Sequence, residues 1–446
     1  MSATLQPPVL PHVEPIPESR RLRWIVAQEG SRQTYSVPLA FYRLGKLRIM
    51  YSDIWCRWGR GLLKRGPAGA RALATRFHPE IPGNLVVSFN FEAIMSRAWN
   101  QLRHANTTPE EASKEYCRFG RWYALRVREH LERVDTNPDR DCFFGFNSNC
   151  LEVIEALKKR RVFTVVDQVD PARVEEEMIL EEMERWPGWA KVRGRITEEY
   201  WKRIEAEWKA ADAVLVNSEW SKQALVQQGV PAEKIITVPL ALDLPRKEAP
   251  QPINPVGTLK ALWLGSVVIR KGIQYLVEAA RLLEGRDIEF LLAGPLAISR
   301  EAVESFPRNI KVLGRITRDR LAEVYRQAHV FVLPTISDGF AVTQLEAMAH
   351  GLPVVTTPNC GRVVTDGVDG LIVPVRDGRA LADALGRVEG DRGLLREMSH
   401  NALQSVKNYG LPSNAAMINQ LVRERRDCMS KAGQAVRRPW ESADKL

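Results

Sequence analysis

The sequence predicts an α/β protein with two doubly wound, Rossmann-like parallel-sheet domains that face a central cleft. Short apolar runs rich in β-branched residues alternate with amphipathic helical stretches along most of the chain, as in parallel sheets covered by helices. The alternation stops once, between Asp243 and Gly257, where four prolines exclude a helix or a central strand. A length of 446 residues suits two such domains.

In the first half of the chain, apolar runs bounded by polar or glycine-bearing segments predict the strands, and amphipathic stretches predict the helices. Strands are expected at 22–28, 47–55, 84–90, 142–146, 162–166, 213–216 and 234–241. Helices are expected at 35–44, within 97–140, and at 150–159, 175–185 and 198–211, with a further helix starting near Ser218.

The second half restarts the alternation after the proline-rich stretch. Strands are expected at 260–265, 288–293, 310–313, 330–333, from 354, and at 371–374. Helices are expected at 273–284, 318–328, 341–351, 379–388 and 414–427. The predicted organisation is therefore a disordered lead-in (1–19), a first domain (20–243), a linker (244–257), a second domain (258–410), and a C-terminal helix with a tail (411–446).

Composition excludes several classes of protein. The apolar fraction of 45% and the charged fraction of 26% are ordinary for a globular protein. No apolar run approaches the roughly 18 residues of a spanning helix, and the first residues lack the layout of a signal peptide. The six cysteines are scattered without metal-ligand spacing, which favours reduced thiols in a cytoplasmic protein.

The net charge of +10 is concentrated towards the two ends of the chain. Such a surplus fits an anionic lipid surface, an acidic glycan or nucleic acid, and equally a solvated basic surface without a partner. No base-reading motif accompanies the charge, so we expect no nucleic-acid partner. We expect a cytoplasmic protein, peripheral on the inner face of an anionic membrane.

The segment 330–351 predicts a ligand site. A buried strand at 330–333 leads into a loop with Asp338 and Gly339, and then into a helix. Ligands of open α/β sheets bind at this end of a strand, and the amides of residues 339–342 would point towards an anion or a hydroxyl. Glu346 falls near the buried face of the helix. It is either an edge residue bonded to a backbone amide or an acceptor for ligand hydroxyls.

A second loop, from Gly265 to Gly272, also ends a strand and opens a helix. It offers a glycine for close backbone approach and the cations Arg270 and Lys271 at a helix start, where a diphosphate would be stabilised. Its spacing is not that of a Walker A loop. Taken alone, the two cations favour a solvated pair at a helix start.

These motifs resemble those of a known family. The sequence Asp-Gly-Phe-Ala-Val-Thr-Gln-Leu-Glu-Ala-Met-Ala-His-Gly-Leu-Pro-Val-Val, from Asp338 to Val355, resembles the signature of family-four retaining glycosyltransferases (group 1 glycosyl transferases), which have the GT-B fold. That family has two glutamates separated by seven residues, and Asp338 here replaces the first. The loop resembles the family's Gly-Arg-x-x-x-x-Lys-Gly phosphate site, in which Lys271 matches the lysine and Ser266 replaces the arginine, with Arg270 a possible substitute. The passage 211–240 resembles the end of the family's first domain. In the resembling fold the last helix, here within 411–446, crosses back to the first domain.

The resemblance implies a hexosyl-type transferase that moves a sugar from a nucleotide-diphosphate sugar, with retention, to a glycan, glycolipid or other hydroxyl acceptor. It implies no cofactor, and no metal is required, since no Asp-x-Asp pair is placed to hold one. Lys271 and Arg270 would meet the charge of the leaving diphosphate, Asp338 would contact the sugar, and Glu346 would bind the ribose hydroxyls. The remaining donor-binding residues expected are Gly265, Ser266, Gly294, Gly314, Arg315, Ile316, Gly339, Phe340, Ala341 and Val342.

The first domain would bind the acceptor, and the sequence defines this part of the site least. Many relatives have a histidine after the strand that matches 162–166, whereas here Val166-Asp167 stands there and only the aspartate is shared. Acceptor-side residues are expected among Glu29, Gly30, Ser31, Asp167, Gln168 and Asp170. For the aspartates, capping of the next helix is an equally good explanation. The other function weighed is a non-catalytic nucleotide-sugar or glycan-binding protein on the same scaffold.

Overall fold

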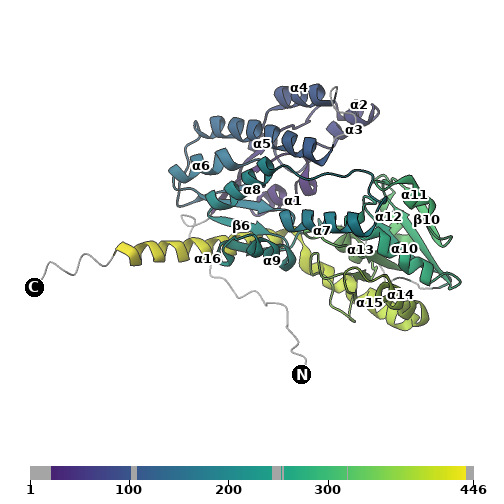
Figure 1. Cartoon of the computed structure of the whole chain (residues 1–446). Coiled ribbons are helices and arrows are strands. Elements are labelled where there is room, and N and C mark those ends of the chain that lie inside the picture. Colours follow the sequence, from purple (N-terminus) through teal and green to yellow (C-terminus); the bar gives the residue numbers. More distant parts are fainter. Residues whose placement is uncertain (1–21, 102–107, 244–252, 254–255, 319, 438–446) are drawn as a thin grey trace, which may run out of the picture.

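The computed structural model describes residues 22–101, 108–243, 253, 256–318 and 320–437 (Figure 1). The expected lead-in, most of the expected linker and the last nine residues lie outside this part of the chain. Two separate sheets form, one of seven strands and one of six. Every recorded strand pair is parallel, so the predicted class of two doubly wound α/β domains is confirmed.

The first sheet has the order β3-β2-β1-β4-β5-β6-β7. The strand order reverses between β1 and β4, and a ligand crevice is expected outside the carboxyl ends of strands at such a point. Its strands are β1 (Arg23–Gln28), β2 (Leu47–Ser52), β3 (Val86–Ser88), β4 (Asp141–Phe146), β5 (Phe163–Gln168), β6 (Ala213–Val216) and β7 (Ile235–Thr237).

Helices cover both faces of the first sheet and bury two apolar clusters, one on each side. Burial on both faces explains why these strands read as continuous apolar runs. The helices are α1 (Ser36–Arg43), α2 (Arg60–Leu63), α3 (Ala68–Ala74), α4 (Asn90–Gln101), α5 (Pro109–Leu131), α6 (Leu151–Lys159), α7 (Arg173–Arg185), α8 (Glu198–Ala210) and α9 (Glu219–Gln227).

The second sheet has the order β10-β9-β8-β11-β12-β13, with its own reversal between β8 and β11. Its strands are β8 (Leu259–Leu264), β9 (Ile288–Ala293), β10 (Ile310–Gly314), β11 (Val330–Leu333), β12 (Val354–Thr356) and β13 (Gly370–Ile372). Its helices are α10 (Ile273–Leu282), α11 (Arg300–Glu304), α12 (Leu321–Gln327), α13 (Thr343–Ala349), α14 (Gly378–Gly390) and α15 (Arg392–Ser405).

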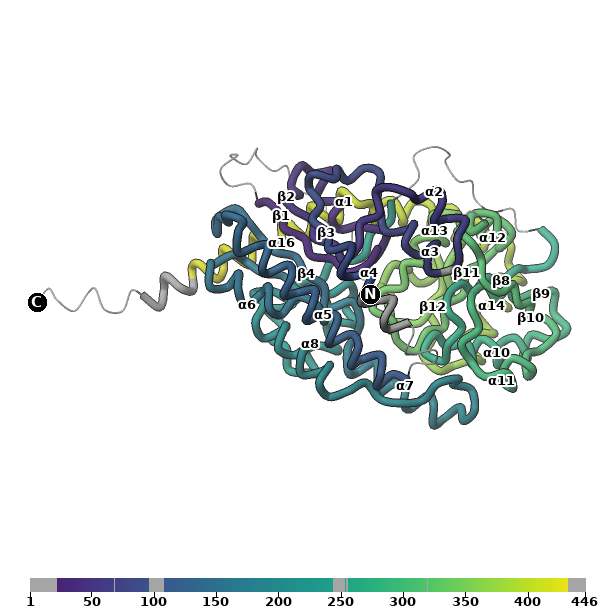
Figure 2. The backbone as a smooth tube through the Cα atoms, turned by 90° about the horizontal axis from the view of Figure 1, so that it is seen from above, coloured from purple at the N-terminus to yellow at the C-terminus, as the bar shows by residue number. Residues whose placement is uncertain are grey.

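The last helix, α16 (Leu411–Arg437), runs along the first half of the molecule. Its apolar residues Ala415, Ile418 and Val422 are buried in the same cluster as Trp24 of β1 and Phe41 of α1. Figure 2 shows this yellow helix beside the purple and blue segments of the first half. The C-terminal segment therefore contributes to the first core, although it follows the second sheet in sequence.

Helix α7 belongs to the first half in sequence but packs on the second half, the reverse of the arrangement of α16. Its residues Ile179 and Met183, and Trp189 just after it, pack against the core of the second half. Backbone bonds continue the contact, because Ser299 donates to the carbonyl of Trp189 at 2.9 Å. Figure 1 shows α7 between the two halves, next to α10 and α13.

A buried carboxylate fixes α7 to the second half. Glu182 is fully buried and accepts hydrogen bonds from Gln274 at 2.8 Å and Tyr275 at 3.0 Å. It also forms an ion pair with Arg376, with its Nε at 2.5 Å. Removal of one partner from such a group leaves a buried charge uncompensated, so this cluster should hold the two halves in one arrangement.

Several element boundaries differ from the sequence predictions. Strand β5 extends to Gln168, so Asp167 and Gln168 lie in the strand rather than in the loop after it. Helix α13 begins at Thr343 and not at Ala341, because Ala341 has a φ of +61°. The prediction of helix from Ala341 was therefore wrong by two residues. Four short or polar helices were not predicted: α2, α3, α11 and α15.

Candidate functional site

The predicted phosphate loop and the predicted signature loop lie against each other. A Cβ atom on Gly272 would lie 1.7 Å from the carbonyl oxygen of Pro334, so only glycine allows this approach. The amide of Ile336 donates to the carbonyl of Arg270 at 2.9 Å. The hydroxyl of Thr335 donates to the same carbonyl at 3.2 Å. Two segments that are over sixty residues apart in sequence therefore form one surface at the carboxyl ends of β8 and β11.

Both predicted cations face Asp338. Lys271 forms an ion pair with its carboxylate, and the Arg270 guanidinium lies 3.6 Å from the same oxygen. Arg270 also donates to the carbonyl of Ser337 at 2.8 Å. The structure therefore brings together three of the four residues predicted as catalytic, and Arg270 and Lys271 are not the solvated pair that the loop alone would allow.

Lys271 is largely buried, and this changes its titration. Burial, with Arg270 beside it, lowers the pKa of Lys271 to about 7, and Glu175 opposes this shift. The ion pair with Asp338 also favours the charged ammonium. An arriving diphosphate would supply a stronger anionic partner, so the charge state of Lys271 is expected to depend on the ligand.

Glu175 of α7 is a site residue that the sequence reasoning missed. Its carboxylate accepts a hydrogen bond from the hydroxyl of Ser337 at 2.9 Å and lies 3.5 Å from the Arg270 guanidinium. Burial raises the pKa of Glu175, and Arg270 opposes this shift. No spacing rule connects an acid in the first half to this loop, so the helix could be predicted but not its contact.

Glu346, the fourth predicted catalytic residue, projects from the first turn of α13. The hydroxyl of Tyr325 in α12 donates to it at 2.9 Å. Burial raises the pKa of Glu346, and the Tyr325 bond opposes this shift. Tyr325 in turn stacks on His350, with ring centroids 4.6 Å apart. The carboxylate of Glu346 therefore accepts its bond from a side chain, and not from a backbone amide as one of the two alternatives above expected.

Three of the predicted donor-binding glycines meet at the ends of neighbouring strands. A Cβ on Gly294 would lie 1.6 Å from the carbonyl oxygen of Gly265, and the amide of Gly294 donates to the carbonyl of Gly314 at 2.8 Å. Ser266 is exposed on the same loop, and Arg315 is also exposed. Ile316 packs against the apolar cluster that contains Tyr325, so the expected base-pocket residues and Glu346 border the same cluster.

The turn before α13 is tightly packed. Phe340 is buried, and a Cβ on Gly361 would lie 2.3 Å from its ring. Ala341 has a left-handed backbone with φ of +61°, a conformation that is uncommon for a residue other than glycine and that clusters at functional sites. Val342 caps the helix in a right-handed conformation without a side-chain bond. The expected run of amides from 339 to 342 is therefore a turn rather than the first turn of a helix.

The two halves of the molecule touch at this loop. A Cβ on Gly339 would lie 2.0 Å from the carbonyl oxygen of Val169, which accepts a hydrogen bond from Asn217 at 2.9 Å. Trp220 donates from its indole to the hydroxyl of Ser337 at 3.1 Å. The first half therefore lies directly over the predicted donor loop.

The predicted acceptor loop at 29–31 follows β1 at the reversal of strand order. The amide of Gly30 donates to the buried carboxylate of Asp53 at 2.8 Å, and Arg76 pairs with Asp53 at 3.3 Å. The loop continues into three consecutive left-handed residues, Gln33, Thr34 and Tyr35. Thr34 accepts a hydrogen bond from Arg318 of the second half at 3.2 Å, so this strained segment spans the space between the halves.

The other predicted acceptor residues separate into two roles. Asp170 accepts bonds from the side chain of Gln168 at 2.8 Å and from the amide of Ala172 at 3.0 Å. It therefore stabilises the turn before α7, but it does not cap the helix, whose N-cap residue is Ala172. Asp167 is buried, and its Oδ1 has no hydrogen-bond partner among the described residues. Burial raises the pKa of Asp167 to about 7, against the opposing effect of Arg32.

Arg32 is a second residue that the sequence reasoning missed. Its guanidinium lies 5.3 Å from the centre of the Phe146 ring, at the end of β4, and it is the cation whose field acts on Asp167. The acceptor side of the crevice therefore contains a buried acid and a cation from neighbouring strand ends. Its position directly after Glu29-Gly30-Ser31 was the only available signal in the sequence.

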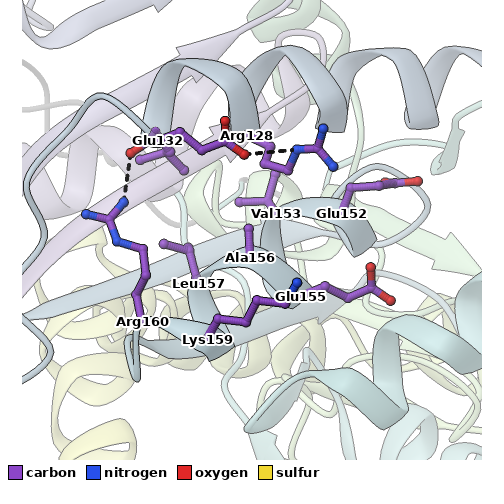
Figure 3. A pocket seen from close by; sticks show the side chains of 10 residues that line it. Arg128, Glu132, Glu152, Val153, Glu155, Ala156, Leu157, Lys159 and Arg160 are labelled. Atoms are coloured by element: carbon purple, nitrogen blue, oxygen red, sulfur yellow. Dashed lines mark hydrogen bonds and ion pairs between the residues drawn. The ribbon is translucent and has the colours of Figure 1, made fainter.

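A separate pocket with a volume of 460 Å³ lies between α5 and α6 (Figure 3). It is lined by side chains of both charges over an apolar floor, and it contains no predicted site residue. Its lining residues are Arg128, Leu131, Glu132, Glu152, Val153, Glu155, Ala156, Leu157, Lys159 and Arg160. In the described part of the chain, no three His, Cys, Asp or Glu side chains are grouped to hold a metal ion. None of the described helices is long and apolar enough to span a membrane.

Comparison with known proteins finds similarity in the second half of the chain. Residues 258–391 match the model of the family described as glycosyl transferases group 1. A D-inositol 3-phosphate glycosyltransferase from Xylanimonas cellulosilytica is 28% identical over 232 residues, which is 46% of this chain and 55% of the relative. The capsular polysaccharide biosynthesis glycosyltransferase CapM of Staphylococcus aureus is 30% identical over 155 residues, which is 33% of this chain and 40% of the relative. The matches thus cover about half of these relatives' length or less.

Solved structures share the whole architecture at low sequence identity. A sucrose-phosphate synthase from Thermosynechococcus elongatus has a TM-score of 0.58 at 16% identity and covers 92% of this chain and 100% of its own. HepE of Anabaena, in complex with UDP, has a TM-score of 0.57 at 13% identity, with coverages of 90% and 100%. The chain therefore has the GT-B fold, and its residues 258–391 match the model of group 1 glycosyl transferases.

Proposed function

We propose that this protein transfers a sugar from a nucleotide-diphosphate sugar to a hydroxyl acceptor in polysaccharide or glycoconjugate synthesis. The observation that carries the proposal is the cluster formed by Arg270, Lys271 and Asp338 at the junction of two strand ends. A diphosphate at this place would meet two cations from one loop. The group 1 family match covers the same segment, and HepE, which shares the fold, was solved with UDP.

Each part of the donor has a residue of suitable chemistry nearby. Lys271 and Arg270 would bind the diphosphate, and Asp338, which contacts both cations, would accept bonds from hydroxyls of the transferred sugar. Glu346, held by Tyr325, would accept bonds from the ribose hydroxyls. The adjacent Gly314 and Ile316 would line the space for the base.

The proposed reaction retains the anomeric configuration. The bond between the anomeric carbon and the phosphate oxygen breaks, and its electron pair stays on the diphosphate. The acceptor oxygen bonds to the same face of that carbon, and its proton passes to the leaving phosphate oxygen. The products are a glycoside and a nucleoside diphosphate. Each cation or amide aimed at the developing charge lowers the activation barrier by about 3 kcal/mol. Arg270 and Lys271 can therefore stabilise the charge of the leaving diphosphate without a metal ion.

The acceptor would bind on the first half, between the 29–35 loop and the end of β5. The Arg318–Thr34 bond supports this location, because Arg318 closely follows the expected base-pocket residues Arg315 and Ile316. Asp167 would act on the acceptor only after a shift that exposes its carboxylate, since it is buried in this arrangement. Glu29, Gly30 and Ser31 form the start of the same loop.

Transfer can be tested with purified protein, a panel of nucleotide-diphosphate sugars and a crude glycolipid and glycan extract. We expect release of a nucleoside diphosphate that depends on both donor and extract, with and without a chelator. Lys271→Ala and Glu346→Ala should each lower the rate at least about tenfold, whereas Glu323→Ala on the exposed face of α12 should not. Full activity in both site variants would refute the site assignment.

A binding protein on the same scaffold is the second candidate. Ser266, which replaces an arginine of the family pattern, is exposed to solvent. An intact nucleotide sugar after long incubation with every extract, together with measurable binding of that nucleotide sugar, would favour this reading over transfer.

A further inference from the structure

One surface of the first half is both cationic and apolar. Between Ile54 and Pro79 the sequence has six basic residues and no acidic residue. This segment supplies most of the basic surplus in the first hundred residues, so the charge belongs to an internal segment and not to the extreme N-terminus. Helices α2 and α3 form within it. Its basic residues are Arg57, Arg60, Lys64, Arg65, Arg71 and Arg76.

Large apolar side chains project from the same segment into solvent. Trp58 is 78% exposed and Leu62 is 79% exposed. Helix α4 adds Phe91, which is 78% exposed, and Met95, which is 58% exposed. Exposed apolar groups that cluster in this way mark interaction surfaces, in contrast to singly scattered ones.

The helices that carry these residues are neighbours. The side chain of Asn90, the first residue of α4, accepts from the amide of Trp55 at 2.6 Å and donates to its carbonyl at 3.1 Å. Leu73 of α3 and Ala93 of α4 belong to the same apolar cluster. Figure 1 shows α2, α3 and α4 together at one extremity of the first half. We call this the α2–α4 surface.

Three of the six cations of the α2–α4 surface, Arg57, Arg60 and Arg71, contact backbone carbonyls or aromatic rings. Arg60 donates to the carbonyl of Ala74 at 3.2 Å and Arg71 to that of Gly66 at 3.2 Å. The Arg57 guanidinium lies 5.1 Å from the centre of the Trp58 ring. In the part of the chain that the structure describes, Arg76 is the only cation of this segment with a recorded carboxylate partner. Glu92 of α4 pairs instead with Arg126, so the surface keeps its positive field.

The α2–α4 surface is joined to the predicted acceptor loop. Asp53, just before the cationic segment, accepts the amide of Gly30. Arg76, at its end, pairs with Asp53 and lies so close to Gly30 that an added Cβ would meet its guanidinium at 2.8 Å. A partner bound to the surface would therefore lie next to the acceptor side of the crevice.

We propose that the α2–α4 surface docks on the anionic face of a lipid bilayer and presents the protein to an acceptor anchored in that bilayer. This inference rests on the proposed function for the identity of the acceptor, though not for the docking itself. Basic side chains are attracted to anionic headgroups, and exposed Trp, Phe, Leu and Met side chains enter the boundary between headgroups and acyl chains. Aliphatic side chains such as Leu62 gain nothing from stacking on nucleic-acid bases, so the composition favours a bilayer over a nucleic acid.

The test uses the full chain and sedimenting vesicles of phosphatidylcholine, with or without phosphatidylglycerol. We expect binding only to the anionic vesicles, and weaker binding as salt rises, because screening shortens the reach of the surface charge. The double variants Trp58→Ser with Leu62→Ser, and Lys64→Glu with Arg65→Glu, should each lower the partition coefficient at least about tenfold. Matched controls from exposed positions elsewhere are Val226→Ser with Leu282→Ser, and Arg379→Glu with Arg396→Glu, which should bind as the parent does.

Docking would be refuted if the parent ignored anionic vesicles at low salt, or if both surface variants bound them normally. Binding of a single-stranded RNA that the same variants lose, without vesicle binding, would overturn it in favour of a nucleic-acid surface.

Activity separates this inference from the proposed function. Surface variants should keep nucleotide binding and transfer to a water-soluble acceptor, and lose transfer to an acceptor embedded in vesicles. Parent protein that binds anionic vesicles but no nucleotide sugar would refute the proposed function and leave the docking intact.

Discussion

The carboxylate of Glu175 accepts a hydrogen bond from the hydroxyl of Ser337 at 2.9 Å, across the boundary between the two halves of the molecule. Ser337 is the residue before Asp338, and its carbonyl accepts from Arg270. An acid of the first half therefore shares a partner with the proposed diphosphate site. This contact makes the relative position of the halves part of the geometry of the site.

The contact between Gly339 and the Val169 carbonyl, where the two halves touch, predicts the effect of adding a single methyl group. Gly339→Ala would place a carbon 2.0 Å from the Val169 carbonyl oxygen, so the loop must shift or the halves must separate. We expect kcat to fall more than KM rises, because donor-loop contacts remain while the acceptor side moves away. Steady-state kinetics test this. Gly390→Ala, where an added carbon meets nothing within 4 Å, should leave kcat unchanged, and equal kinetics for the two variants would contradict the prediction.

The buried Glu182 predicts a large loss of stability on truncation. Glu182→Ala would leave Gln274, Tyr275 and Arg376 without their common acceptor. Breaking a buried ion pair costs about 3–5 kcal/mol, and because Arg376 is partly exposed we expect roughly 2–4 kcal/mol in the free energy of unfolding.

Chemical denaturation measures this loss. The neighbouring Glu181 also pairs with Arg376 but is exposed, so Glu181→Ala should change the free energy of unfolding by less than about 1 kcal/mol. Equal losses in the two variants would show that burial of Glu182 is not the cause.

The lowered pKa of Lys271, about 7, predicts how nucleotide affinity changes with pH. A bound diphosphate favours the ammonium and raises its pKa, so binding takes up a proton at pH values between the free and bound pKa. Affinity should therefore fall as pH rises above about 7, by up to about tenfold per pH unit. Titration calorimetry at rising pH, in buffers of different ionisation enthalpy, detects the uptake. Lys271→Arg should bind with little pH dependence in this range, and a flat profile in the parent protein would contradict the prediction.

The Tyr325–Glu346 bond predicts an effect at the acid end of the pH range. Burial raises the pKa of Glu346 and the Tyr325 hydroxyl opposes this rise, so Tyr325→Phe should raise the pKa further. If the ribose hydroxyls need the ionised carboxylate, the pH below which nucleotide binding weakens should move upward in this variant. Binding at neutral pH should fall about three- to tenfold through the lost hydrogen bond. If the pH below which nucleotide binding weakens were the same in the parent and in Tyr325→Phe, Glu346 would not bind the ligand in its charged form.

The fold could be predicted from the sequence because buried parallel strands have a strong local signature. The runs at 213–216, 288–293 and 330–333 became β6, β9 and β11 with the predicted bounds. The short helices α2 and α3 were missed because four and seven residues of basic, glycine-bearing sequence are too few to show a helical apolar period. The start of α13 was misplaced because the left-handed Ala341 has no signature in its residue type, unlike a glycine at such a position.

Site residues could be predicted where they lie within a local sequence motif. They could not be predicted where they reach the site from a segment distant in sequence. Lys271 and Asp338 were identified from two loops at strand ends, and the structure pairs them. Glu175 and Arg32 were missed, because their contacts with Ser337 and with Asp167 depend on how α7 and the loop after β1 are placed in space. Local periodicity carries no information about such placement.

The central claim is that the segment 258–391 binds a nucleotide-diphosphate sugar through the Lys271 and Glu346 loops. The most direct test is a thermal-shift panel of UDP, GDP, ADP, CMP and several nucleotide sugars, with and without magnesium, on the parent protein and Glu346→Ala. A ligand that binds only the folded state raises the unfolding temperature with the logarithm of its concentration over Kd. We predict a shift with one nucleoside diphosphate and its sugars, unaffected by magnesium and lost in the variant. Absence of a shift with every nucleotide, or an equal shift in Glu346→Ala, would contradict the claim.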